Sequence, residues 1–145
     1  YKDIPSFLRP LEKFSVVEIN WLCYGSGGAK TREPGGVMER FKRHSHPEHK
    51  LNTHVKSIVD PRRVCTMTGC HEASRISGKA ADSHGNPLKK GFRDRVPQQD
   101  VVRINHYAVK SYEEFLGKRS RGRARVTTLR DMSYFEQYDL NDIVE

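Results

Sequence analysis

Apolar positions occur in short runs along the chain, and the first run predicts a buried strand. Residues 16–22, VVEINWL, are rich in β-branched and aromatic side chains, as is typical of a largely buried strand. A short helix is expected before it, over residues 3–14, because Asp3 is a good N-cap and Pro5 suits a first turn. Pro10 then strains or ends that helix.

Two more segments predict strands, and a polar stretch separates them. Residues 55–61, VKSIVDP, form the second strand, which the Asp-Pro pair closes. Residues 101–107, VVRINHY, alternate apolar with polar side chains and form the third. Between them, residues 65–99 are polar with scattered glycines and prolines, which indicates a long loop with one short hairpin.

Three helices are expected beyond the first strand. Residues 33–44, EPGGVMERFKRH, read as a turn that enters a helix, with an apolar face made by Val37, Met38 and Phe41. Ser111 and Glu114 form a capping box that opens a helix ending near Gly122. A C-terminal helix follows around Met132 to Tyr138.

A glycine-rich loop, YGSGGA at residues 24–29, follows the first strand directly. Glycine allows backbone to approach a ligand closely, but the same residues form ordinary tight turns. The loop lacks the Lys and Ser/Thr of a P-loop and the spacing of a dinucleotide fingerprint. It is therefore not predicted to cradle a nucleotide phosphate.

The composition indicates a loop-rich domain, or part of a larger one. The chain has 145 residues, 35% of them hydrophobic, and its mean hydropathy is -0.78. No apolar run approaches the roughly 20 residues that span a bilayer. The cysteines are Cys23, Cys65 and Cys70, and an odd and small number of cysteines does not form a disulfide framework. This count favours a reducing compartment.

The net charge of +8 favours anionic partners. The basic run KRSRGRAR, residues 118–125, has three interpretations. It could be a solvated face, one or two of its arginines could meet the diphosphate of a small ligand, or it could bind a nucleic-acid backbone. No aromatic residues interleave with it, so nucleic acid ranks below the other two.

The histidine-rich segment is a weak zinc candidate. A structural zinc site takes about four nitrogen or sulfur ligands at defined spacing. Cys65 and Cys70 have four residues between them and no matching histidine pair, so a solvated loop is favoured. The segment and its surroundings contain His44, His46, His49, His54, Cys65, Cys70 and His71.

Two other polar residues have both a structural and a functional interpretation. His106 lies within the third strand, where a histidine is more often a hydrogen-bonded structural residue than a metal ligand or catalytic group. Glu39 follows the glycine loop and could act as a general base. Its plainer interpretation is a surface carboxylate paired with Arg43, four residues on.

Four segments in order resemble the second half of family 92-type and related family 2-like glycosyltransferases. They are INWLCYGSGGAKTREPGGVMERF, HVKSIVDPRRV, INHYAVKSYEEFLGKRSRG and FEQYDLNDI, and together they cover nearly the whole chain. The resemblance implies the C-terminal, acceptor-side portion of a GT-A fold, a Rossmann-like α/β domain, here as a loop-rich mixed sheet with flanking helices. Residues 1–145 would be a single domain or a partial one.

The family pattern places an Asp-x-Asp metal motif just before a segment like IPSFLRPLE, and this sequence has none there. We therefore expect the nucleotide-binding half to lie outside these residues, on the same or another chain. The resemblance implies transfer of a sugar from a nucleotide-sugar donor to a carbohydrate or glycoconjugate hydroxyl, with inversion and with Mn²⁺ or Mg²⁺. The isolated piece could be inactive. A cytoplasmic or membrane-peripheral location is expected, or the Golgi lumen for a eukaryotic parent protein.

The resemblance also implies roles for individual residues. Glu39 would be the base that deprotonates the acceptor, and His106 would hold metal or diphosphate. Lys110 and Lys118 would lie on the phosphate side. The residues implied in substrate binding are Trp21, Gly25, Ser26 and Gly27. The competing hypothesis is a non-catalytic basic module that binds carbohydrate or nucleic acid.

Overall fold

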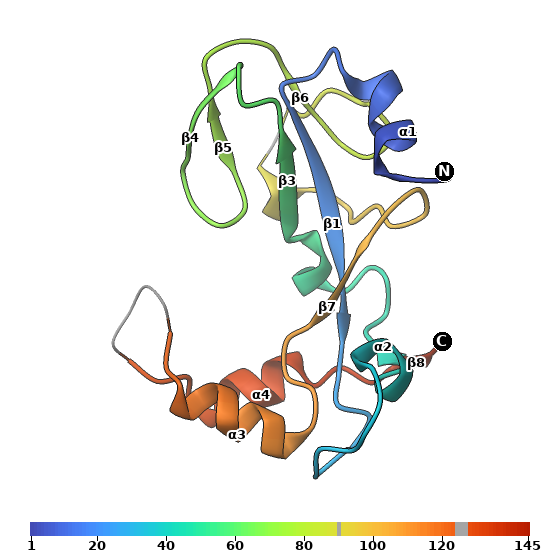
Figure 1. The fold of residues 1–145 in the computed structure, drawn as a ribbon, viewed down its shortest axis with the longest axis vertical. Coiled ribbons are helices and arrows are strands. Elements are labelled where there is room, and N and C mark those ends of the chain that lie inside the picture. The colour runs from blue at the N-terminus through green and yellow to red at the C-terminus, as the bar shows by residue number, and fades with distance from the viewer. Residues whose placement is uncertain (90, 124–127) are drawn as a thin grey trace. The chain divides into compact units, whose positions relative to one another are not determined.

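The computed structural model describes residues 1–89, 91–123 and 128–145, and they form two compact units (Figure 1). Unit 1 contains Tyr1–Trp21 and Pro47–Ile104, and unit 2 contains Leu22–His46 and Asn105–Glu145. Strand β1 (Val16–Tyr24) contributes to both units, and so does β7 (Ile104–Tyr107), which pairs with it.

Unit 1 is built around the first part of β1. Strand β1 pairs antiparallel with β3 from Val16 opposite Val59 to Asn20 opposite Val55, and parallel with β6. Strands β4 and β5 form a separate hairpin, as expected within the polar stretch (Figure 1). The other elements of unit 1 are α1 (Ile4–Leu8), η1 (Arg9–Leu11), η2 (Lys50–Thr53), β3 (Val55–Val59), β4 (Val64–Met67), β5 (Ala73–Arg75), β6 (Ala80–Ala81) and η3 (Phe92–Asp94).

The amino-terminal helix covers the hydrophobic core of unit 1. The Asp3 carboxylate accepts a hydrogen bond from the Ser6 amide at 2.8 Å, which caps the first turn as predicted. Pro10 falls in the short η1 turn that ends the helical segment. The buried side chains of this core are Phe7, Leu11, Phe14, Val17, Ile19 and Ala81. Val17 and Ile19 belong to β1, which is buried along its whole length, as predicted.

Unit 2 combines short strands with two helices. Strand β1 pairs with β2 (Arg43–His44) at Tyr24 opposite His44, and β2 pairs with β8 (Ile143–Val144). Helices α3 (Tyr112–Ser120) and α4 (Met132–Tyr138) share a core (Figure 1). The capping box at Ser111 and the C-terminal helix are both confirmed. The core consists of Ala108, Val109 and Phe115, covered by Met132, Tyr134, Phe135 and Tyr138.

Two expected elements are shorter in the structure, and the short strands β2, β6 and β8 were not expected. The helix in residues 33–44 is only the single turn α2 (Val37–Arg40). Phe41 then adopts extended backbone, with φ of -115° and ψ of 99°, and its ring is buried. Met38, expected on the apolar face, is 64% exposed. The third strand occupies only the second half of its predicted range. The paired strands β2 and β8 are too short to leave a periodic pattern.

The fold is a mixed α/β arrangement with a mostly antiparallel sheet. The α/β class and the mixed sheet predicted from the sequence are therefore confirmed. Among the described residues, no helix has the length and apolar character needed to cross a membrane.

Candidate anion-binding site

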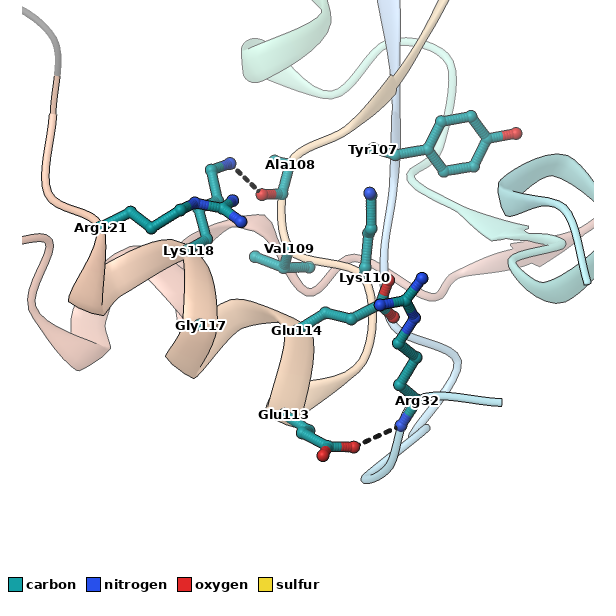
Figure 2. Close-up of a pocket in the computed structure, with 10 residues that line it drawn as sticks. All are labelled: Arg32, Tyr107, Ala108, Val109, Lys110, Glu113, Glu114, Gly117, Lys118 and Arg121. Carbon is teal, nitrogen blue, oxygen red and sulfur yellow. Dashed lines mark hydrogen bonds between the residues drawn. The ribbon is translucent and has the colours of Figure 1, made fainter. Parts of the chain in front are cut away.

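Unit 2 contains a pocket of about 610 Å³ with four cationic side chains around it (Figure 2). Lys118 and Arg121 extend from the end of α3, whereas Lys110 and Arg32 extend from two loops. The remaining lining residues are Tyr107, Ala108, Val109, Glu113, Glu114 and Gly117. The pocket therefore gathers residues from three separate stretches of the sequence.

Local backbone structure explains how these side chains meet. Lys110 lies between β7 and the Ser111 cap of α3, and its φ of 64° is in the left-handed region. Such a conformation costs a non-glycine residue roughly 1–2 kcal/mol, and strain of this kind is often found at functional sites. The Arg32 loop is fixed by its own amide, which donates to the Glu113 carboxylate at 2.7 Å.

Both carboxylates of the pocket are already engaged by other groups. Glu114 receives two hydrogen bonds from the Arg40 guanidinium, each at 3.0 Å, and one from the Ser111 hydroxyl at 2.8 Å. These partners, Arg40 first, lower the pKa of Glu114 to about 2. Glu113 accepts from the Arg32 amide, a neutral group. The pocket consequently has a positive balance of charge.

Lys118 is a partly buried cation of the pocket. Its ammonium group donates to the Ala108 carbonyl (Figure 2). The same group lies 5.5 Å from the centre of the Tyr134 ring. Burial, followed by the positive charges of Arg130, Lys110 and Arg121, lowers the pKa of Lys118 to about 8. An anion in the pocket would relieve this repulsion, so the arrangement suits a phosphate or diphosphate group.

The glycine loop also lies in unit 2, where the C-terminal segment contacts it. The Ser26 amide donates to Asp139 at 2.6 Å, and the Gly27 amide donates to Asn141 at 2.7 Å. Ser26 is buried and Gly27 is exposed. The close approach that the glycines permit is therefore made, in this structure, by the protein's own backbone and side chains.

Glu39, the predicted base, has a structural role in the first turn of α2. Its carboxylate accepts a hydrogen bond from the Gly36 amide at 2.7 Å, so it caps its own helix. The expected pairing with Arg43 is wrong, because the Arg43 guanidinium donates to the Asn141 carbonyl instead. The side chain of Glu39 is exposed, and its role as a base stays a prediction.

His106 lies on β7, just before the residues that line the pocket. Its ring is half-buried, and its centre lies 6.0 Å from that of Tyr138. Within residues 1–89, 91–123 and 128–145, no group of three or more His, Cys, Asp or Glu side chains could hold a metal ion. One imidazole alone is not a metal site, and the Mn²⁺ or Mg²⁺ stays a prediction of the resemblance.

Trp21 packs in unit 1, whereas the other predicted site residues belong to unit 2. Its indole is buried and stacks on His54 with ring centres 5.0 Å apart, and His71 lies 5.3 Å away. Phe92 completes this cluster from η3. The indole of Trp21 therefore packs within this aromatic cluster, and its role in substrate binding stays a prediction.

Lys110 and Lys118 both line the pocket, and their place on a phosphate side stays a prediction of the resemblance. Arg121 belongs to the basic run, for which contact with a diphosphate was one interpretation, and residues 124 and 125 of that run lie outside the described part. Arg32 was missed, because a single arginine in a loop after the glycines carries no pattern.

Comparison of the chain with protein-family models, with curated proteins and with solved structures found no match.

Proposed function

We propose that this chain is the acceptor-side part of a GT-A-type glycosyltransferase that moves a sugar from a nucleotide-sugar to a carbohydrate hydroxyl. The observation that supports this proposal is the cationic pocket of unit 2. Two lysines that the family resemblance places on the phosphate side, Lys110 and Lys118, both line it. A basic segment that only faced solvent would not need to share a pocket with Lys110.

The chemistry of sugar transfer explains why such a pocket would be needed. The leaving group is a nucleoside diphosphate, and cations aimed at its oxygens stabilise the negative charge that develops as the glycosidic bond breaks. Lys118 and Arg121 would face that charge from α3, and Lys110 from the preceding turn. An arginine can bind a phosphate through two parallel hydrogen bonds, whereas a lysine acts as a point charge.

The acceptor side of the reaction needs a base, because a sugar hydroxyl is a poor nucleophile. Glu39 is assigned this role by resemblance alone. A change of Glu39 to Gln tests it, since glutamine can still accept from the Gly36 amide and keep the cap but cannot take a proton. Transfer should fall at least about 100-fold without a change in stability. Normal transfer by this variant would remove Glu39 from the mechanism.

A divalent metal remains a prediction of the resemblance, and no catalytic step is assigned to it. His106 would offer one imidazole to such an ion. His106→Ala should then weaken nucleotide binding only when Mn²⁺ is present. Equal nucleotide affinity of the variant and the unchanged protein in Mn²⁺ would exclude His106 as a ligand.

The proposal as a whole is tested by binding and turnover. Calorimetry with nucleoside diphosphates should show binding that weakens about 10- to 100-fold in Lys118→Gln, as expected for loss of a charged hydrogen bond. Lys50→Gln, a change of an exposed lysine in unit 1, is the matched control and should bind normally. Incubation with nucleotide-sugars, Mn²⁺ and acceptor should release nucleoside diphosphate.

The result that would overturn the proposal is salt-dependent retention on a DNA or RNA column with no affinity for nucleoside diphosphates or nucleotide-sugars. The net charge of +8 is the observation that favours this nucleic-acid alternative. Binding of nucleoside diphosphate that is unaffected by Lys118→Gln would leave a transferase possible but would place the diphosphate elsewhere.

A further inference from the structure

We propose that the C-terminal segment Asp139–Asp142 is a clasp that positions the glycine loop Gly25–Gly28, with Asp139 and Asn141 as its positioning residues. The assignment of the clasp rests on contacts within unit 2. Its consequence for catalysis rests on the proposed function.

The first observation is that three successive amides of the loop have acceptors within the protein. Ser26 donates to Asp139 Oδ1 at 2.6 Å, and Gly27 donates to Asn141 Oδ1 at 2.7 Å. Gly28 donates to the Ser26 hydroxyl at 3.0 Å. A ligand at this loop would therefore meet the Cα surface of its glycines rather than these amides.

The second observation is the absence of space at Gly25. A Cβ atom at this position would lie 2.4 Å from the Leu140 carbonyl oxygen and 2.4 Å from Asn141 Oδ1. Real Cβ atoms do not approach oxygen so closely, so only glycine allows the clasp to lie against the loop. Gly27 and Gly28 have φ of 63° and 81°, which also favours glycine. The clasp therefore explains the glycine at position 25, and the left-handed backbone of the turn explains the glycines at positions 27 and 28.

The third observation is that the clasp is itself held in place. The Asn141 amide group donates to the Asp139 carbonyl at 3.0 Å and to its carboxylate at 2.9 Å. Arg43 donates to the Asn141 carbonyl at 3.2 Å, and strand β8, which follows the clasp directly in the chain, pairs antiparallel with β2. The Asp142 carboxylate accepts from the His46 amide at 3.1 Å. One carboxylate oxygen of Asp139 therefore binds both the loop and the neighbouring residue of the clasp.

These contacts allow the clasp to set the shape of the glycine loop. The shape of the loop depends on side chains more than 110 positions away in the sequence. If the loop borders the sugar in the proposed transferase, then Asp139 and Asn141 determine where its surface lies, although neither touches substrate. Loosening the clasp should then raise the KM for sugar substrate more than it lowers kcat, because bound substrate can reorder the loop.

Hydrogen exchange of the 145-residue chain tests the clasp independently of any activity. In Asp139→Ala the Ser26 amide should exchange about 10- to 100-fold faster, because a charge-assisted hydrogen bond is lost. In Asn141→Ala the Gly27 amide should respond most. Asp139→Asn keeps an acceptor oxygen and should retain most of the protection. The Phe115 amide, which donates to the Ser111 carbonyl at 2.9 Å in the same unit, should be unchanged in all three.

Two results would overturn the clasp. One is exchange at Ser26 and Gly27 that does not differ between the unchanged protein and the alanine variants. The other is a loss of protection at Phe115 in Asp139→Ala that equals the loss at Ser26, which would make Asp139 a general stabilising residue. In an active transferase, an unchanged KM despite faster loop exchange would refute only the catalytic consequence. Absence of transferase activity would refute the proposed function and leave the exchange result valid.

Discussion

The two units use their charged residues differently. Unit 1 pairs them with one another: Glu18 with Arg95, Asp60 with Arg62 and Arg63, and His84 with Asp100. In unit 2, Arg40 is paired with Glu114, and this pair removes a carboxylate from the pocket that the cations surround. Charges in unit 1 hold chain segments together, whereas the cations of the unit 2 pocket can bind an anion.

The cores differ in a related way. The unit 1 core consists mainly of aliphatic and phenylalanine side chains. Those that precede β1 in the chain pack against the side chains of this strand. The core of unit 2 is a set of aromatic rings, in which Phe115 stacks parallel to Tyr134 at 6.2 Å and Tyr134 stacks on Tyr138 at 4.5 Å. The rings of α4 therefore support α3, the helix that carries two cations of the pocket.

The largest expected effect comes from removing the centre of the aromatic core. Phe115→Ala should lower the free energy of unfolding by about 3–5 kcal/mol, because a fully buried ring leaves a cavity. Denaturant unfolding measures the change. Leu116→Ala is the matched control, since its side chain is 40% exposed and should cost much less. Equal losses for the two variants would contradict the core assigned to unit 2.

A smaller loss is expected where a methyl group is added beside the clasp. Gly25→Ala should destabilise unit 2 by about 1–3 kcal/mol, because the new Cβ would overlap the Leu140 carbonyl oxygen. Gly69→Ala adds the same group in the β4–β5 hairpin of unit 1, where nothing lies within 4 Å, and should be close to neutral. Thermal unfolding of both variants provides the comparison. A neutral Gly25→Ala would mean that the C-terminal segment does not lie against the loop.

The next prediction separates stability from anion binding at Lys110. Lys110→Gly should be about 1 kcal/mol more stable than Lys110→Ala, because glycine adopts the left-handed backbone of this position without strain. Both variants should bind nucleoside diphosphate equally weakly, since both lack the ammonium group. Thermal unfolding and calorimetry on the same samples measure the two effects. Undiminished binding by either variant would remove Lys110 from the site.

Acid should affect unit 2 through the carboxylate paired with Arg40. The pKa of Glu114 is about 2 in the folded protein and near 4.5 when unfolded, so its contribution to stability is complete above pH 4.5 and is lost as the pH falls towards 2. Glu114→Gln should be less stable at neutral pH and should lose less stability across this window. Denaturant unfolding at a series of pH values measures it, and parallel pH profiles for the two proteins would contradict the pairing.

The smallest effect is expected at the histidine of the unit 1 aromatic cluster. Burial, followed by the charges of His71, Arg93 and Lys56, lowers the pKa of His54 from its ordinary value of 6.5. Its neutral form is favoured in the folded state, so stability should decline as the pH falls below 6.5. His54→Asn retains a donor for the Leu51 carbonyl and should flatten this decline. Amide exchange at Trp21, compared at pH 7.5 and 5.5, measures the effect, and an upward titration shift of His54 by NMR would contradict it.

Elements held by local contacts were predictable from the sequence in both units, whereas the long-range contacts of unit 2 were not. The helix cap at Asp3, strands β1 and β3 and the hairpin were predictable, because each depends on residues close together in the chain. The same holds in unit 2 for the capping box at Ser111 and for α4. In the candidate site, Lys110 and Lys118 came from the resemblance, and Arg121 came from the basic run. Arg32 and the clasp had no local signal.

The sequence alone determined the elements whose stability is local: caps, apolar runs and the glycines that permit a tight turn. Tertiary structure decided which groups meet. Asp139 and Asn141 reach the glycine loop only because β8 pairs with β2, which brings the end of the chain beside residues 25–28. Likewise, Arg40 neutralises Glu114 in the wall of the cationic pocket, through a pairing across 74 positions that no periodicity records. Such contacts depend on how separate elements pack, and packing is determined by the whole chain.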